Sequence, residues 1–192
     1  MESVHVLKST IKLAPGVYKW WCSKEMLKQI LKKLNCYSSV NINRDIEHCV
    51  YNKKVLYCIY VGIATKESLN SRIEWHISNH TASQLRSKNV SISTLRHSLA
   101  AIFFNDISTS INEALNKLME NLFVSIHYES QFDIGSIEAS QEIKKIESNI
   151  LKSGKFYVLN IQGNNKSIAI KELKKLRNDA KQRALNNTVS GI

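Results

Sequence analysis

Proline and long apolar runs are scarce in this 192-residue chain. Pro15 is its single proline, only six glycines accompany it, and there are no repeats, so the chain is not a low-complexity sequence. No stretch of about 18 consecutive apolar residues is present, so we expect no segment that spans a membrane. Residues 1–6 lack the basic start and apolar middle of a signal peptide, which indicates a cytoplasmic protein.

The cysteines lack the close spacing of a typical metal or redox motif. Cys22, Cys36, Cys49 and Cys58 contain no CxxC pair. A zinc site that uses these thiols, with His48 in place of one of them, is the less favoured interpretation. Reduced structural or surface cysteines are favoured for an intracellular chain.

Acidic residues are few compared with basic ones. The 16 Asp and Glu against 27 Lys and Arg leave a net charge of +11 and a pI near 9.5. This excess favours a polyanionic partner, and nucleic acid in particular. The apolar fraction of 43% and the charged fraction of 22% are typical of a globular protein. We expect one domain over residues 1–185 and a disordered tail over residues 186–192.

The spacing of apolar residues predicts a mixture of strands and helices. Serines at 23 and 93 are suited to cap two of the helices, and Gly154 is suited to end a third. Residues 35–52 have no clear periodicity, which leaves a loop or a short strand. The predicted strands cover residues 17–22, 55–64, 123–128 and 156–161, and the predicted helices cover 24–34, 69–79, 93–103, 111–122, 139–152 and 167–184.

Two tyrosine motifs precede a helix that carries an arginine and a histidine. Gly16-Val17-Tyr18 begins the first strand, Tyr60-Val61-Gly62 ends the second, and Arg72 and His76 follow one helical turn apart. Phosphodiester hydrolysis needs an activated water and neutralisation of charge on the phosphate. Arg72 can hold a phosphate through two parallel hydrogen bonds. A phenol with a pKa near 10 is a poor base, so a catalytic tyrosine needs positive charge nearby.

A carboxylate and an amide complete the set in the second half of the chain. Glu147 lies on a predicted helix, and Asn160 lies on the run that follows it. A lone carboxylate suits one Mg²⁺ ion, because Mg²⁺ keeps several waters and takes few protein ligands. Taken singly, such residues are more often core aromatics or helix-surface side chains. Their ordered occurrence in a strongly basic chain favours a site that cuts a phosphodiester.

In this order the motifs resemble the GIY-YIG nuclease superfamily, which includes excision-repair endonucleases, homing endonucleases and some restriction enzymes. The resemblance covers roughly residues 14–165. It implies an α/β (α+β) fold with a small, mainly antiparallel central sheet flanked by helices. It further implies a restriction- or defence-type endonuclease that cuts double-stranded DNA with one Mg²⁺ or Mn²⁺ ion.

The resemblance also implies roles for single residues. Tyr18 and Tyr60 would be the general base and its supporting phenol, in an order that the sequence leaves open. The remaining implied roles are charge stabilisation for Arg72, proton transfer or phosphate contact for His76, metal binding for Glu147 and orientation of the site for Asn160. Five basic residues are expected to contact backbone phosphates, namely Lys66, Arg86, Lys88, Arg96 and His97.

Two departures from the family pattern support an alternative function. The tyrosines are far apart, so a helix and a loop would be inserted over residues 24–52. This insertion is either a DNA-contacting elaboration or evidence that the first strand is wrongly assigned. Ile63 stands after the second glycine, where the family often has a lysine, and Lys66 is the nearest replacement. The alternative is a non-catalytic nucleic-acid-binding domain that keeps the nuclease fold, and RNA is a weaker alternative substrate. The target site and the oligomeric state are left open.

Overall fold

A five-stranded antiparallel sheet forms the centre of the computed structural model, which describes residues 2–3, 13–78, 93–128, 131–163 and 166–187. The strand order is β1-β5-β2-β4-β3, and each neighbouring pair is antiparallel. The predicted α+β class with a small antiparallel sheet is therefore confirmed. The strands are β1 (Glu2–Ser3), β2 (Gly16–Cys22), β3 (His48–Tyr51), β4 (Lys54–Ala64) and β5 (Phe123–Tyr128).

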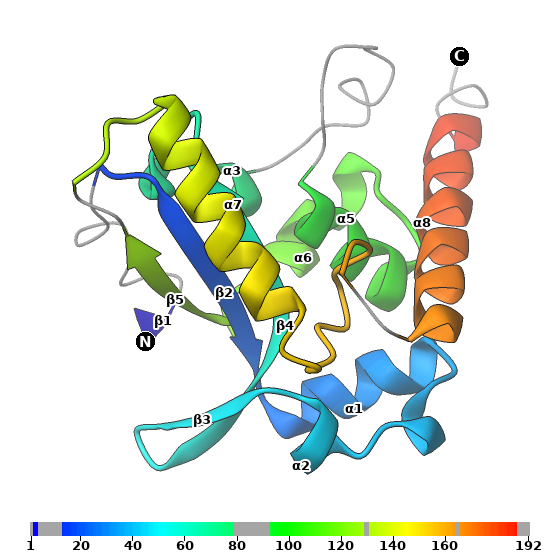
Figure 1. The fold of residues 1–192 in the computed structure, drawn as a ribbon. Helices are drawn as coiled ribbons and strands as arrows, with labels where there is room; N and C mark the ends of the chain where they lie inside the picture. Colours follow the sequence, from blue (N-terminus) through cyan, green and yellow to red (C-terminus); the bar gives the residue numbers. More distant parts are fainter. Residues whose placement is uncertain (1, 4–12, 79–92, 129–130, 164–165, 188–192) are drawn as a thin grey trace.

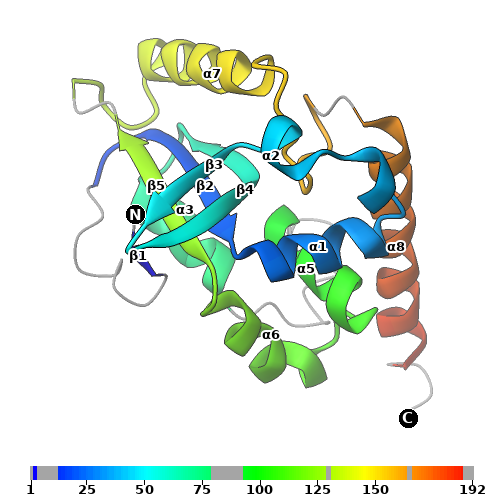
Figure 2. The ribbon, with the colours of Figure 1, turned by 90° about the horizontal axis from the view of Figure 1, so that it is seen from below.

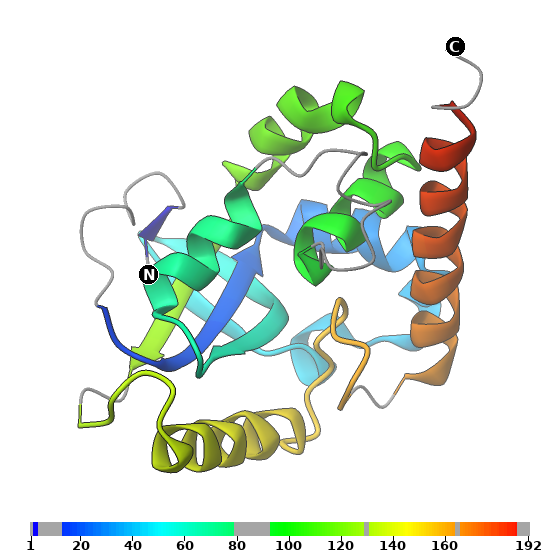
Figure 3. The same ribbon diagram turned by 90° about the horizontal axis from the view of Figure 1, so that it is seen from above.

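Helices cover both faces of the sheet (Figure 1). They are α1 (Lys24–Lys33), α2 (Ile42–Asp45), α3 (Leu69–Ile77), α5 (Thr94–Phe104), α6 (Asn112–Met119), α7 (Ile137–Leu151) and α8 (Ser167–Asn187). Figures 2 and 3 show α7 on one side of the sheet and α3, α5 and α6 on the other. Helix α8 packs along α5 at the edge of the molecule. No helix in the described ranges is long and apolar enough to cross a membrane.

A β-bulge in β4 decides which face the second tyrosine motif occupies. Trp20 pairs with Tyr60, but the next residue, Trp21, pairs with Cys58, so Ile59 is an extra residue in β4. Because side chains alternate along a strand, Tyr60 would otherwise lie on the Cys58 face, against α7. The bulge places it on the opposite face, in the core shared with α3 and α5.

The sequence-based prediction of a strand over residues 156–161 is wrong. The segment is buried up to Asn160 but has an irregular, turn-containing backbone. The N–H of Leu159 donates to the carbonyl of Ile59 at 2.9 Å, whereas the N–H of Asn160 turns back to the carbonyl of Tyr157. Burial alone gave this run the apolar composition of a strand.

Most other predicted elements agree with the structure. Ser23 and Ser93 accept hydrogen bonds from the backbone as the N-caps of α1 and α5. Residues 35–52, which the sequence left open, include α2 and the short strand β3. Helix α8 continues to Asn187, so it includes the first two residues of the expected tail, and residues 188–192 lie outside the described ranges.

Candidate active site

Tyr18 lies across Gly62, which pairs with it directly on the neighbouring strand. A Cβ atom added at Gly62 would lie 2.3 Å from the phenol oxygen of Tyr18 and 2.4 Å from its Cζ. The glycine is therefore required by the phenol above it, since its backbone is not in the left-handed region. Tyr60 lies on the same face, with its ring centroid 6.3 Å from that of Tyr18.

A hydrogen-bonded chain runs from Tyr18 through His76 to Ser93. The phenol oxygen lies 2.6 Å from Nε2 of His76, and Nδ1 of His76 bonds to the hydroxyl of Ser93. His76 is completely buried on α3, one turn after Arg72. When Nδ1–H donates to Ser93, the lone pair of Nε2 faces the phenol, which is the tautomer that a proton acceptor needs.

Both tyrosines hold their protons tightly in the free protein. Burial raises the pKa of Tyr18 well above 10, and neighbouring Tyr60 raises it further, while Arg72 acts in the opposite direction. Burial likewise raises the pKa of Tyr60. A cation near Tyr18 was expected from its role as a base. Arg72 is that cation, but its effect is smaller than that of burial, so Tyr18 needs a proton acceptor, and His76 is in hydrogen-bonding contact.

Arg72 is held by Glu67, by Trp75 and by the phenol of Tyr18, and one of its nitrogen atoms is left without a partner within the described ranges. Its Nη1 donates to Glu67 at 3.1 Å, and its guanidinium carbon lies 4.4 Å from the ring centroid of Trp75. Its Nε is buried and has no hydrogen-bond partner among the described residues. A buried guanidinium N–H without an acceptor is unfavourable, so this atom is suited to receive an anion such as a phosphate oxygen.

Glu147 is the candidate metal-binding carboxylate. It is half-buried on α7, and in the described part of the chain it forms no ion pair. Burial raises its pKa, and its charge in turn raises the pKa values of Tyr18 and Tyr60. The described part of the chain contains no group of three His, Cys, Asp or Glu side chains that could hold a metal ion. An unpaired carboxylate fits one Mg²⁺ ion whose other ligands are waters and substrate.

Asn160 acts on the backbone of the second tyrosine motif. Its Oδ1 accepts from the N–H of Val61 and its Nδ2 donates to the carbonyl of Val61, both at 2.8 Å. Strand β3 pairs with β4 only as far as Tyr57, so the amide of Asn160 occupies the place of a neighbouring strand. Asn160 thus fixes the backbone between Tyr60 and Gly62.

The five residues expected to contact DNA phosphates are differently placed. Arg96 is 2% exposed and donates to the side-chain oxygens of Asn112 and Asn116. His97 is also buried and bonds to α8. Lys66 is exposed between β4 and α3. Arg86 and Lys88 lie outside the described ranges.

Sequence reasoning missed two side chains of this site. Ser93 was identified only as a helix cap, and its bond to His76 joins residues that are 17 positions apart in the sequence. Arg177 acts on Tyr60 from α8, where a run of lysines suggested a solvated face. Ile63 lies on the other face of β4, half-buried against the cluster of α7, so this position contributes packing.

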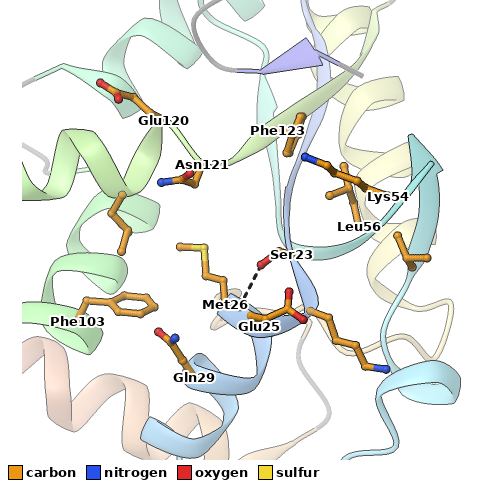
Figure 4. Close-up of a pocket in the computed structure, with 13 residues that line it drawn as sticks. Ser23, Glu25, Met26, Gln29, Lys54, Leu56, Phe103, Glu120, Asn121 and Phe123 are labelled. Carbon is orange, nitrogen blue, oxygen red and sulfur yellow. Dashed lines mark hydrogen bonds between the residues drawn. The ribbon is translucent and has the colours of Figure 1, made fainter. Parts of the chain in front are cut away.

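A large cavity lined by described residues lies away from Tyr18, Tyr60 and His76. It has a volume of about 690 Å³ and is at the opposite end of the sheet, where β2 ends and β4 begins. Met26, Phe103 and Phe123 supply apolar walls, and Lys54 and Glu120 lie at its margin (Figure 4). The cavity contains none of the predicted site residues, so the catalytic candidates are the buried cluster around Tyr18.

The comparisons with known proteins agree with this geometry. No curated protein and no solved structure matches the chain. A family model described as the GIY-YIG catalytic domain matches residues 16–182, a span that begins at the first tyrosine motif and includes the whole hydrogen-bonded cluster. The match covers most of the chain, and the two tyrosine motifs lie side by side on paired strands. The chain therefore belongs to the GIY-YIG catalytic-domain family of nucleases.

Proposed function

We propose that this protein is a cytoplasmic endonuclease that hydrolyses phosphodiester bonds of double-stranded DNA with one Mg²⁺ or Mn²⁺ ion. The observation that carries the proposal is the buried hydrogen bond between Tyr18 and His76, formed where Gly62 leaves room for the phenol. A phenol that is already bonded to a proton acceptor can receive a proton from water as it gives up its own.

The proton transfer can be written with named atoms. The attacking water gives a proton to the phenol oxygen of Tyr18 while the phenol proton moves to Nε2 of His76. The imidazolium that forms keeps its Nδ1–H on Ser93. The high pKa of Tyr18 makes its oxygen strongly basic once its own proton leaves. Arg72 then stabilises the charge that develops on the phosphate.

Glu147 would hold the divalent cation in this reaction. When bound, the cation supplies charge neutralisation at the phosphate and at the leaving 3′ oxygen. The described chain contributes one carboxylate to this task, which leaves coordination positions for water and for substrate. Asn160 keeps the tyrosine motif in register, and exposed Lys66 would contact a backbone phosphate.

A restriction or defence role is the biological part of the proposal. The position of His76 one turn after Arg72 is similar to the restriction-enzyme branch of the family, and both side chains are turned to the same phenol. The net charge of +11 supports a polyanionic substrate.

A non-catalytic nucleic-acid-binding domain is the second candidate. The raised pKa of Tyr18 favours it, because burial raises this pKa by more than Arg72 lowers it, and the apolar Ile63 adds no second cation after the glycine. Such a protein would bind DNA in a salt-dependent manner and would release no cleaved product.

A plasmid digest supplemented with Mg²⁺ or Mn²⁺ tests the proposal. Wild type is expected to nick the plasmid, whereas Tyr18→Phe and Glu147→Ala lose nicking and keep DNA binding in a gel shift. Glu142→Ala is the matched control, since Glu142 lies on the same helix in a surface ion pair with Lys145. Undiminished nicking by Glu147→Ala would contradict the proposal that Glu147 binds the metal ion. A gel shift without product on duplex, single-stranded and branched DNA and on RNA would favour the second candidate.

A further inference from the structure

Arg177 lies at the border between the buried and exposed faces of α8. The buried face of this helix packs against the core through Ala169, Leu173, Ala180 and Ala184. Arg177 is half-buried, and exposed Lys174 and Lys181 lie three positions before and four positions after it, on the same side of the helix. Lys175, two positions away, points to nearly the opposite side. The helix thus presents a stripe of three cations.

His97 holds Arg177 at both its backbone and its side chain. Nε2 of His97 lies 3.1 Å from the carbonyl oxygen of Arg177, so this nitrogen carries the hydrogen and donates it. Burial and the charge of Arg177 lower the pKa of His97 to about 4, which keeps the ring neutral at pH 7. Nδ1 therefore has a lone pair, and Nη2 of Arg177 donates to it at 3.4 Å. The two bonds fix the direction of the guanidinium.

The guanidinium has no acidic partner within the described ranges. Burial lowers the pKa of Arg177, and the hydroxyl of Tyr60 acts in the opposite direction; Arg177 in turn lowers the pKa of Tyr60. The charge therefore acts directly on a phenol of the site. A half-buried charge without a counter-ion is unfavourable, and a phosphate matches the planar fork of an arginine.

We propose that Arg177, positioned by His97, is a phosphate-binding residue of the active site and contacts the DNA strand on the Tyr60 side of the scissile bond. The stripe of Lys174 and Lys181 extends this contact along the backbone of the same strand. The inference rests on the proposed function, because it takes a DNA strand as the ligand.

The salt dependence of binding measures the contact. A short fluorescein-labelled duplex is titrated in EDTA at several salt concentrations, with Glu147→Ala as the parent so that no cleavage occurs. Arg177→Gln is expected to raise Kd about 10-fold and to reduce the slope of log K against log salt by about 0.9, the value for one phosphate contact. Lys175→Gln removes the same charge from the other side of α8 and is expected to change the slope little.

His97 is tested as a positioning residue by two variants. His97→Leu is expected to weaken binding about as much as Arg177→Gln does, whereas His97→Gln keeps a donor and an acceptor and is expected to restore most of it. In the double variant His97→Leu with Arg177→Gln the losses are expected not to add, because both act on one contact. Thermal melts of each variant confirm that it is folded. If Arg177→Gln does not fold, Arg177→Lys keeps the charge and loses the fork, and an intermediate Kd is expected.

The outcomes separate the two proposals. Equal changes for Arg177→Gln and Lys175→Gln, with a wild type that nicks plasmid, would show that Arg177 is an ordinary surface charge and would overturn this inference alone. A wild type that neither binds nor cleaves DNA would overturn the proposed function, and the inference with it.

Discussion

Gly62→Ala is the most informative single change, because it adds one methyl group directly beneath the phenol of Tyr18. The new Cβ would lie 2.3 Å from the phenol oxygen, 2.4 Å from Cζ and 2.8 Å from Cε2. Ordinary van der Waals contact begins at about 3.4 Å, so the phenol must move by about 1 Å. The backbone at Gly62 suits any residue, so the whole effect comes from this contact.

Two magnitudes follow from that displacement. Overpacking in a closely packed core costs about 1–3 kcal/mol, and for a chain of this length each kcal/mol lowers Tm by about 2–4 °C. The phenol oxygen now lies 2.6 Å from Nε2 of His76, and a shift of about 1 Å breaks that bond. Misplacing a reacting group by this distance lowers a rate by about 100-fold.

Nicking rates and thermal melts of the same preparations test both values. Gly154→Ala is the control for stability, because it strains a left-handed backbone (φ +78°) where no atom lies within 4 Å of the added Cβ. It is expected to lower Tm and to leave the nicking rate unchanged. Gly62→Ala is expected to lower both.

A double-mutant cycle shows whether Tyr18 causes the effect. In a Tyr18→Leu background the shorter side chain leaves room for the methyl group, so adding Gly62→Ala is expected to cost close to zero in unfolding free energy. A wild-type nicking rate in Gly62→Ala, or the same stability loss in both backgrounds, would refute the proposal that the glycine exists to admit the phenol.

Three further changes test separate contacts. Ser93→Ala removes the partner of His76 Nδ1 and the cap of α5, so it is expected to lower the nicking rate about 10-fold and the unfolding free energy by about 1 kcal/mol. Ser93→Thr keeps the hydroxyl and is expected to keep the rate and the stability. Equal nicking rates for the two variants would contradict the role of the hydroxyl. Asn160→Leu leaves the N–H and carbonyl of Val61 unpaired at a buried edge, and urea denaturation is expected to show a loss of about 1–3 kcal/mol per group. Burial lowers the pKa of His97 from 6.5 to about 4, so as pH falls the unfolded chain binds a proton at this ring before the folded protein does. The contribution of neutral His97 to the unfolding free energy is therefore fully present above pH 6.5 and is lost toward pH 4, by about 3 kcal/mol at most. Unfolding free energies at both ends of this range are expected to change less in His97→Gln, and parallel curves would contradict the assignment.

Local chemistry made much of the fold predictable. Ser23 and Ser93 are side-chain caps that a sequence displays directly, and the helices that follow them begin where expected. The strand of Tyr18 and the strand of Tyr60 were recognisable from β-branched and aromatic runs. These features depend on neighbours in the chain, so no tertiary information was needed to find them.

Contacts between distant segments were not predictable in the same way. The run before Asn160 has the composition of a strand, yet a side-chain amide makes the bonds to Val61 that a strand backbone would make. Arg177 and His97 are 80 residues apart, and nothing local to α8 distinguishes this arginine from the lysines around it. Such pairs are set by helix packing, which the sequence pattern of one helix does not specify.

The bulge in β4 links the two tyrosine motifs more strictly than their sequence order does. If Ile59 paired regularly with Trp20 instead of forming the bulge, Tyr60 and Gly62 would face α7, and Tyr18 would lie opposite Val61 in place of the glycine. With the bulge, the register sets Tyr18 opposite Gly62 and brings Tyr60 to the same face. The spacing of two between Tyr60 and Gly62 is therefore a requirement of strand alternation: one position supplies the second phenol and the next on that face makes room for the first. Deleting Ile59 should therefore leave Tyr60 and Gly62 on their present face, because Tyr60 would follow Cys58 directly and the pairs Trp20–Tyr60 and Tyr18–Gly62 would continue a regular ladder.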